Sequence, residues 1–297
     1  MLRKRILASL AAVTMAATVA VIAPTASSQA EVSAQACTFT NWVQGQWYTT
    51  GSIVKFEGNF YVAEHDNPGY SPTVSTWYWD PYNCNGGGGG GGGGSAILTE
   101  AQFNQMFPSR NSFYTYSGLV TAMSAYPAFA TTGSDTVKKQ EAAAFLANVS
   151  HETGGLVHVE EINKNNDLCD ESRPYGCPRG TYAYYGRGPI QLSWNFNYKA
   201  AGDYLGIDLL GNPQWVAQQA PIAWKTGLWY WNTQTGPGWT TGHNAMVNGN
   251  GFGETIRSIN GSLECNGGNP AQVQSRVSKY QQFVGILGVP AGANLYC

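Results

Sequence analysis

The first feature that could do chemistry is a glutamate at the end of a strongly helical run. Residues 138–152 have high helix propensity, and Phe145, Val149 and Glu152 recur at the spacing of one helix face. A carboxyl on an apolar face is partly desolvated, which favours its protonated form, and a general acid needs that form. The competing interpretation is a helix-end glutamate bonded to nearby backbone, and periodicity alone weighs the two equally.

The second feature is a pair of acidic residues, Glu160 and Glu161, that follows a glycine break. On an unbroken helix Glu161 would point about 180° away from Glu152, about 13 Å along the axis. The paired glycines Gly154 and Gly155, which follow Thr153, end the helix, because they permit a left-handed turn. Two carboxyls can then face each other across a cleft, at the roughly 6.5–9.5 Å that leaves room for a water molecule in an inverting glycosidase.

A third segment, residues 185–197, is dense in glycine, amide and hydroxyl groups beside aromatic rings. Amides can pair with the hydroxyl and N-acetyl groups of a sugar, while ring faces stack on pyranose faces. A buried structural loop would have a similar composition, so composition alone does not decide.

Other catalytic chemistries lack their required residues. Position 155 is glycine where a His-Glu-x-x-His zinc site needs its second histidine, and the whole chain has 4 His. The sequence has no Gly-x-Ser-x-Gly elbow and no Gly-Lys-Ser/Thr phosphate loop, and Gln191 stands where a dinucleotide fingerprint needs a third glycine. We therefore expect no metal ion and no cofactor.

The elements that position these residues are mostly helical. Thr99 and Gln102 form a capping box, Ser134 and Asp135 offer caps, and Asn-Pro pairs at 212–213 and 269–270 place a cap before a first-turn proline. We expect helices over residues 100–107, 119–126, 137–152, 213–219, 221–231 and 270–287. Strand signals after residue 95 are sparse.

The chain begins with three positive charges and an Ala-rich apolar run that ends near Ala23. Residues 1–36 therefore resemble a secretory signal peptide, with cleavage after Ala30 or Ala36. A membrane anchor is the competing interpretation, but the run is weakly hydrophobic and no basic stop-transfer cluster follows it. We expect a secreted, extracellular protein with no membrane attachment after signal removal.

Nine consecutive glycines within residues 85–95 mark a flexible linker. They separate a small domain, residues 37–84, from residues 96–297, which are long enough for a core of their own. The small domain alternates as short strands, 53–56 and 60–63, with a turn at Gly58-Asn59. Such a short chain buries little apolar surface, so a bridge between its ends has a structural role.

The six cysteines form an even set in an exported chain, which favours disulfides over a metal site. Fifteen pairings are formally possible. Their order along the chain suggests three local pairs: Cys37 with Cys84, Cys169 with Cys177, and Cys265 with Cys297.

The charge balance favours an uncharged partner. The net charge is −2, and removing residues 1–36 takes away three basic and one acidic residue, which leaves −4. Only 11% of residues are charged while 13% are aromatic. Nucleic acid and anionic membrane are therefore disfavoured as partners, and a neutral polysaccharide is favoured.

Three motifs in order resemble the signatures of glycoside hydrolase family 19 chitinases. They are His-Glu-Thr-Gly-Gly at 151–155, Tyr-Gly-Arg-Gly-Pro-Ile-Gln-Leu-Ser at 185–193, and Asn-Gly-Ser-Leu-Glu-Cys at 260–265. The resemblance covers essentially all of residues 96–297. It implies a mainly α-helical, lysozyme-like fold with a long cleft and inverting hydrolysis of chitin within the chain, and it agrees with the pairs 169–177 and 265–297.

The resemblance also implies residue roles. Glu152 matches the general acid, Glu161 the general base, with Glu160 as its rival, and Ser193 the hydroxyl that holds the attacking water. The expected substrate-binding residues are Gln191, Asn197, Asn260, Glu264 and Arg276, of which the last two form a charged network behind the catalytic pair. Chitin and N-acetylglucosamine oligosaccharides are the expected partners of a monomeric enzyme. The stretch after Glu161 is short against the plant pattern, which suggests fewer outer subsites.

The small domain resembles family 5/12 chitin-binding modules and is expected to be an all-β, disulfide-closed unit. Where many relatives carry a Trp-Trp binding pair, this sequence has Glu-His-Asp at 64–66. Trp77 and Trp79 share one face of a strand and are the expected substitute, which Tyr70 could extend. The competing interpretation is that one of these tryptophans belongs to the core.

Two other functions fit parts of the sequence. Similar folds serve muramidases and endolysins that cleave bacterial cell-wall glycan, but the chitin-module resemblance argues against this. A non-catalytic, antifungal chitin-binding lectin is the other alternative, and the presence of both Glu152 and Glu161 argues against it.

Overall fold

The computed structural model describes residues 38–63, 65–72, 78–82 and 97–297. The expected signal peptide, the linker over residues 85–95, the pair Cys37 and Cys84, and Trp77 lie outside the described residues. Among the helices that are described, none is both long and apolar enough to cross a membrane.

The first described segment forms a four-stranded sheet in the order β1-β2-β3-β4. Its strands are β1 (Thr40–Asn41), β2 (Ile53–Phe56), β3 (Asn59–Ala63) and β4 (Trp79–Tyr82). β1 pairs with β2 in parallel, and the other neighbours are antiparallel. The hairpin turn consists of Glu57 and Gly58, both at positive φ, so it lies one residue earlier than the sequence indicated.

The small core of this sheet corrects the expected binding surface. Trp79 is 1% exposed and packs with Tyr48, Val54 and Ala63. Its indole Nε1 donates to the carbonyl of Tyr70 at 2.6 Å, so its polar group is satisfied inside the fold. The assignment of Trp79 to a sugar-stacking surface is wrong, because the side chain fills the core. Tyr70 remains 52% exposed.

Residues 97–297 are mainly helical, as expected for a lysozyme-like fold. The helices are α1 (Glu100–Met106), α2 (Tyr116–Ser124), α3 (Asp135–Thr153), α4 (Asn195–Leu205), α5 (Trp215–Gln218), α6 (Ala220–Thr233), α7 (Gly242–Val247), α8 (Phe252–Glu264) and α9 (Pro270–Leu287). The Thr99 capping box and the Asn269 cap with its first-turn proline are both present. Asn212 does not cap a helix, because its side chain bonds to Asp208 and the helical turn begins only at Trp215.

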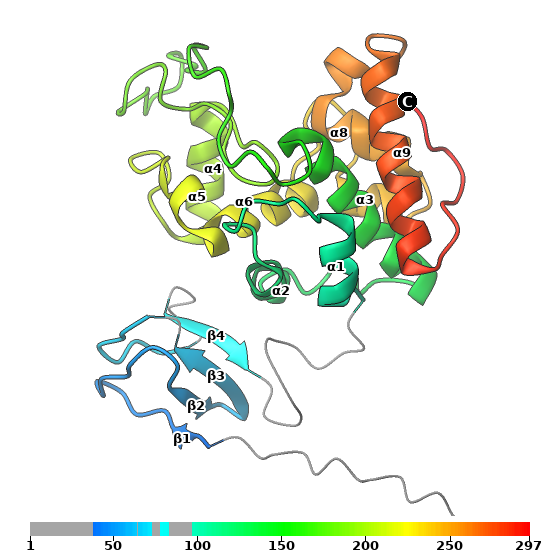
Figure 1. The fold of residues 1–297 in the computed structure, drawn as a ribbon. Coiled ribbons are helices and arrows are strands. Elements are labelled where there is room, and N and C mark those ends of the chain that lie inside the picture. The colour runs from blue at the N-terminus through cyan, green and yellow to red at the C-terminus, as the bar shows by residue number, and fades with distance from the viewer. Residues whose placement is uncertain (1–37, 64, 73–77, 83–96) are drawn as a thin grey trace, which may run out of the picture. The chain divides into compact units, whose positions relative to one another are not determined.

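The core of this region is built around α3 (Figure 1). Residues 141–150 of α3 are buried on every face, which the run of small alanines permits. α3 packs along α9, and the ring of Phe145 on α3 packs against the rings of Trp224 and Trp231 on α6. A side chain at position 227 in α6 would be crowded, because an added Cβ would lie 3.0 Å from Pro189 and 3.4 Å from Phe145.

Two disulfides close loops in this region. Cys169 pairs with Cys177, and Cys265 at the end of α8 pairs with Cys297. Both pairs are those expected from the sequence. The second bridge ties residues 288–297 back to α8 after they leave α9.

Candidate active site

Glu152 lies in the last turn of α3. The helix begins after the cap residue Ser134 and ends at Thr153, because Gly154 adopts a left-handed conformation with φ 63°. The expected glycine break is therefore confirmed. The Glu152 side chain is 19% exposed, which leaves its carboxyl within reach of solvent at the edge of the buried helix.

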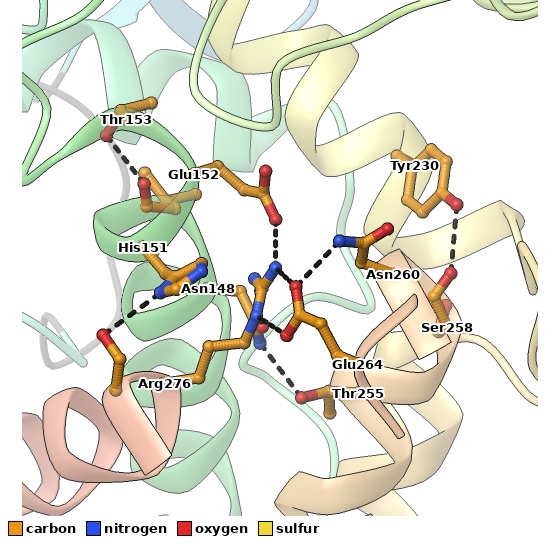
Figure 2. Close-up of polar contacts among 12 residues, drawn as sticks. Asn148, His151, Glu152, Thr153, Tyr230, Thr255, Ser258, Asn260, Glu264 and Arg276 are labelled. Carbon is orange, nitrogen blue, oxygen red and sulfur yellow. Dashed lines mark hydrogen bonds and ion pairs between the residues drawn. The ribbon is translucent and has the colours of Figure 1, made fainter. Parts of the chain in front are cut away.

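Arg276 from α9 lies behind this carboxyl (Figure 2). Its Nη2 lies 2.5 Å from Oε1 of Glu152 and 2.6 Å from Oε1 of Glu264. Its Nε donates to Glu264 Oε2 at 2.7 Å, and its Nη1 donates to Asn148 Oδ1 at 3.2 Å. Asn260, where α8 is kinked, donates to Glu264 Oε1 at 2.8 Å. One guanidinium thus connects α3, α8 and α9.

This arrangement differs from the apolar setting expected for Glu152, because a cation stands against the carboxyl. Glu264 accepts two hydrogen bonds from the guanidinium, while Glu152 and Asn148 accept one each. Burial acts to raise the pKa of Glu264, but the hydrogen bonds and charge of Arg276, with a hydrogen bond from Asn260, outweigh it and hold that pKa below its ordinary value. Glu264 is therefore the member of the cluster that stays ionised.

Glu161 follows α3 on a loop and is held by donors from two segments. Its Oε2 accepts the backbone N–H of Gly186 at 2.9 Å, and its Oε1 accepts the amide of Asn166 at 3.2 Å. Its own N–H donates to the carbonyl of Gly186 at 2.7 Å. Donors of this kind stabilise an ionised carboxylate.

Glu160, the rival of Glu161, is engaged elsewhere. It accepts hydrogen bonds from Lys164 and Tyr185, both at 2.7 Å, and lies 3.6 Å from Arg187. Burial acts to raise the pKa of Glu160, but the hydrogen bonds from Lys164 and Tyr185 and the nearby positive charges hold it below its ordinary value.

The turn between Gly186 and α4 is conformationally strained. Gln191 and Trp194 both have positive φ, 51° and 75°, a region that side chains disfavour. Ser193 between them donates from Oγ to the carbonyl of Gln191 at 2.8 Å. Gly186 lets the side chains of this turn approach its backbone closely, because an added Cβ would lie 3.0 Å from Gln191 Oε1 and 3.3 Å from Ser193 Oγ. The turn therefore presents its polar side chains in one fixed arrangement.

These segments enclose a cleft of about 910 Å³. Of the residues expected at the site, the cleft is lined by Glu152, Glu161, Ser193, Gln191, Asn197 and Asn260. Glu264 and Arg276 do not line it, because each is 1% exposed. Their inclusion among the substrate-binding residues is wrong, and they form only the charged network behind Glu152.

Sequence reasoning missed several residues that line the cleft, among them Asn166, Trp194 and Tyr230. Tyr230 projects from α6, and its hydroxyl donates to the carbonyl of Ser258 at 3.0 Å. Burial, with the nearby charge of Glu152, raises the pKa of Tyr230 to about 12. The aromatic run at 229–231 was the available signal, but periodicity alone does not say which of its rings leaves the core.

Residues 97–297 match the family described as chitinase class I of glycoside hydrolase family 19. This chain belongs to that family. The motifs at 151–155, 185–193 and 260–265 fall within the matched residues, and each of them contributes to the cleft or to the charged network behind it.

Proteins similar to this family 19 chain come from plants and bacteria. Endochitinase A of Zea mays is 47% identical over 208 residues, which cover 68% of this chain and 71% of that protein. The crystal structure of chitinase C from Streptomyces griseus HUT6037 aligns with a TM-score of 0.68 and 69% identity, over 69% of this chain and 100% of that one. A family 19, class IV chitinase from Zea mays aligns with a TM-score of 0.61 and 44% identity, over 68% of this chain and 98% of that one.

Proposed function

We propose that this family 19 chain is a secreted, endo-acting chitinase that hydrolyses β-1,4-N-acetylglucosamine linkages with inversion at the anomeric carbon. The observation that carries the proposal is that Glu152 and Glu161, from separate segments, line one cleft whose other described lining residues are uncharged. Relatives named as endochitinases support the substrate class.

Glu152 acts as the general acid. Arg276, Glu152 and Glu264 together carry one guanidinium and two carboxyls. These three side chains are electrically neutral only when one carboxyl carries a proton. Glu264 accepts three hydrogen bonds from Arg276 and Asn260 and stays ionised, whereas Glu152 contacts Arg276 through a single oxygen and faces the cleft. Glu152 is thus the carboxyl placed to donate a proton to the glycosidic oxygen as the bond to the anomeric carbon breaks.

Glu161 acts as the general base. Its carboxylate is oriented by hydrogen bonds from Gly186 and Asn166, and neither donor is a cation. A water molecule held by Ser193 attacks the anomeric carbon from the face opposite the leaving group and transfers a proton to Glu161. The positive charge that develops on the sugar ring is stabilised by this carboxylate.

The rest of the cleft suits a neutral sugar chain. Gln191, Asn197 and Asn260 present amides that can pair with hydroxyl and N-acetyl groups. Trp194 is 38% exposed and offers a ring face for stacking. Such a lining favours N-acetylglucosamine polymers over charged ones.

The N-terminal part delivers the enzyme to its substrate. Residues 1–36 direct secretion, residues 37–84 bind chitin, and residues 85–95 link this module to the catalytic domain. The enzyme works as a monomer, with chitin and its oligosaccharides as its partners.

The test is the anomeric configuration of products from a defined N-acetylglucosamine hexamer, followed by proton NMR during the first minutes of reaction. New reducing ends should appear first as the α-anomer, because the β-linkage is inverted once. Initial release of the β-anomer would refute the inverting mechanism, and absence of cleavage would refute the proposal that the chain hydrolyses chitin.

A further inference from the structure

Glu161 is held by a short strand-like pairing rather than by its loop alone. Residues 159–161 run beside residues 186–188, with the N–H of Gly188 donating to the carbonyl of Val159 at 2.8 Å. The N–H of Glu161 donates to the carbonyl of Gly186 at 2.7 Å. Successive side chains of an extended segment face opposite sides, so Glu160 and Glu161 lie on opposite sides of one backbone.

The side chain of Glu160 contacts the segment that orients Glu161. Tyr185 donates its hydroxyl to Oε1 of Glu160 at 2.7 Å, one residue before the Gly186 N–H that binds the Glu161 carboxylate. On the solvent side Lys164 donates to Oε2 at 2.7 Å, and its Nζ lies 5.0 Å from the centroid of the Tyr185 ring. Glu160 does not line the cleft, and these contacts account for both of its oxygens.

A buried cation completes the arrangement. Arg187 is 4% exposed, and its guanidinium lies 3.6 Å from the centroid of the Tyr185 ring. Its Nη1 donates to the hydroxyl of Tyr198 on α4 at 2.8 Å. Its buried Nε has no hydrogen-bond partner and lies 3.6 Å from Oε1 of Glu160. The Glu160 carboxylate is thus the countercharge of a buried guanidinium.

We propose that Glu160 is a positioning residue for Glu161: it binds Tyr185 and compensates Arg187, and so fixes the backbone that holds the Glu161 carboxylate in the cleft. The inference rests on the proposed role of Glu161 as the base. It also gives Glu160 an electrostatic effect, because its negative charge lies next to Glu161 in the chain and partly offsets the charges of Lys164 and Arg187. The groups that face Glu160 are Lys164, Tyr185 and Arg187, with Tyr198 behind Arg187.

Glu160→Gln in the full chain tests the proposal, because glutamine keeps the shape and an oxygen acceptor but removes the charge. We expect kcat to fall by about 10- to 100-fold, as small misplacements of a catalytic group do, with KM for a soluble oligomer unchanged. The acidic limb of the kcat profile should move to lower pH, because losing the neighbouring negative charge and exposing two cations favours ionised Glu161.

Lys164→Met provides the opposite perturbation. It removes a cation while leaving Tyr185 and Arg187 in place, so the acidic limb should move to higher pH. A purely structural role for Glu160 would not give shifts of opposite sign in the two variants. Tyr185→Phe removes the donated hydroxyl without changing a charge, and it should lower kcat with the limb unmoved.

Glu171→Gln is the matched control, because Glu171 is an exposed glutamate of the same loop region and does not line the cleft. The melting temperature of each variant shows that it is folded, and if Glu160→Gln does not fold, Lys164→Met and Tyr185→Phe carry the test. Wild-type kcat and pH profile in Glu160→Gln would overturn the inference. Full activity in Glu161→Gln would instead overturn the assignment of the base.

Discussion

Glu264→Gln should reveal how the charge of Glu264 acts on Glu152. Glu264 and Glu152 both contact Nη2 of Arg276, so their nearest oxygens lie within about 5 Å of each other. At an effective dielectric constant of about 20, two unit charges at that distance repel by about 3 kcal/mol, which corresponds to about two pH units. Without the Glu264 charge, Arg276 and an ionised Glu152 form a neutral pair, and the proton is released more readily.

We therefore expect the basic limb of the kcat profile of Glu264→Gln to move to lower pH by about two units. Removing one partner of a buried ion pair also destabilises a fold by about 3–5 kcal/mol, and we expect about 3 kcal/mol because glutamine keeps a hydrogen-bond acceptor. For a domain of this size, that loss lowers the melting temperature by about 6–12 °C. The folded-state pKa of Glu264 lies below its ordinary value, so its stabilisation is complete above the unfolded pKa near 4.3 and disappears as pH falls. The stability difference between wild type and variant should therefore shrink in acid.

Oligomer hydrolysis from pH 4 to 10 and calorimetry from pH 3 to 7 measure these effects. Glu254→Gln is the control, because Glu254 lies on the same helix and pairs with Arg257 near the surface. A Glu264→Gln profile that superimposes on the wild type would refute the argument that the charge of Glu264 acts on Glu152. A melting temperature unchanged within about 2 °C would refute the stabilising role of the ion pair.

Three further predictions concern other parts of the chain. Glu152→Gln should lower turnover by at least the 10²–10⁴-fold that proton transfer contributes, while calorimetry still detects oligomer binding; near-normal activity would exclude Glu152 as the acid. Cys297→Ser should lower the stability of the catalytic domain by about 4 kcal/mol, because the bridge to Cys265 closes a loop 32 positions apart, and an unchanged urea midpoint would contradict this. Deleting residues 37–84 should reduce activity on insoluble chitin but not on soluble oligomers; equal losses on both would contradict a targeting role.

The helices that sequence predicted well are those whose ends carry local signals. Ser134 caps α3, Gly154 ends it, and Asn269 with its first-turn proline opens α9, because each of these effects depends on residues within one turn. The Asn-Pro pair at 212–213 carries the same signal without a helix, since the Asn212 side chain bonds to Asp208 instead. A cap signal thus fixes a helix boundary only where no other hydrogen bond takes the same side chain, and at Asn212 that competing bond is itself local.

The site shows the same division between local and distant effects. The motifs located both acidic residues of the cleft, and the glycine break correctly indicated that Glu161 leaves the axis of α3. The contact of Arg276 with Glu152 joins residues 124 positions apart, and nothing in the periodicity of α3 encodes it. The assignment of Trp79 to a sugar-stacking surface was wrong for a related reason. Strand alternation predicts two faces, but it does not say which face is covered by the rest of the fold.

The left-handed backbone at Gln191 and Trp194 has a consequence for engineering the enzyme. Each position is held in a conformation that costs about 1–3 kcal/mol for an ordinary side chain, and glycine would relieve most of it. A screen for heat resistance is therefore expected to select glycine substitutions at these two positions. Such variants will stay folded at higher temperature, but the turn that lines the cleft will be held less rigidly. Selection for thermal stability in this protein should therefore also require activity in the same round.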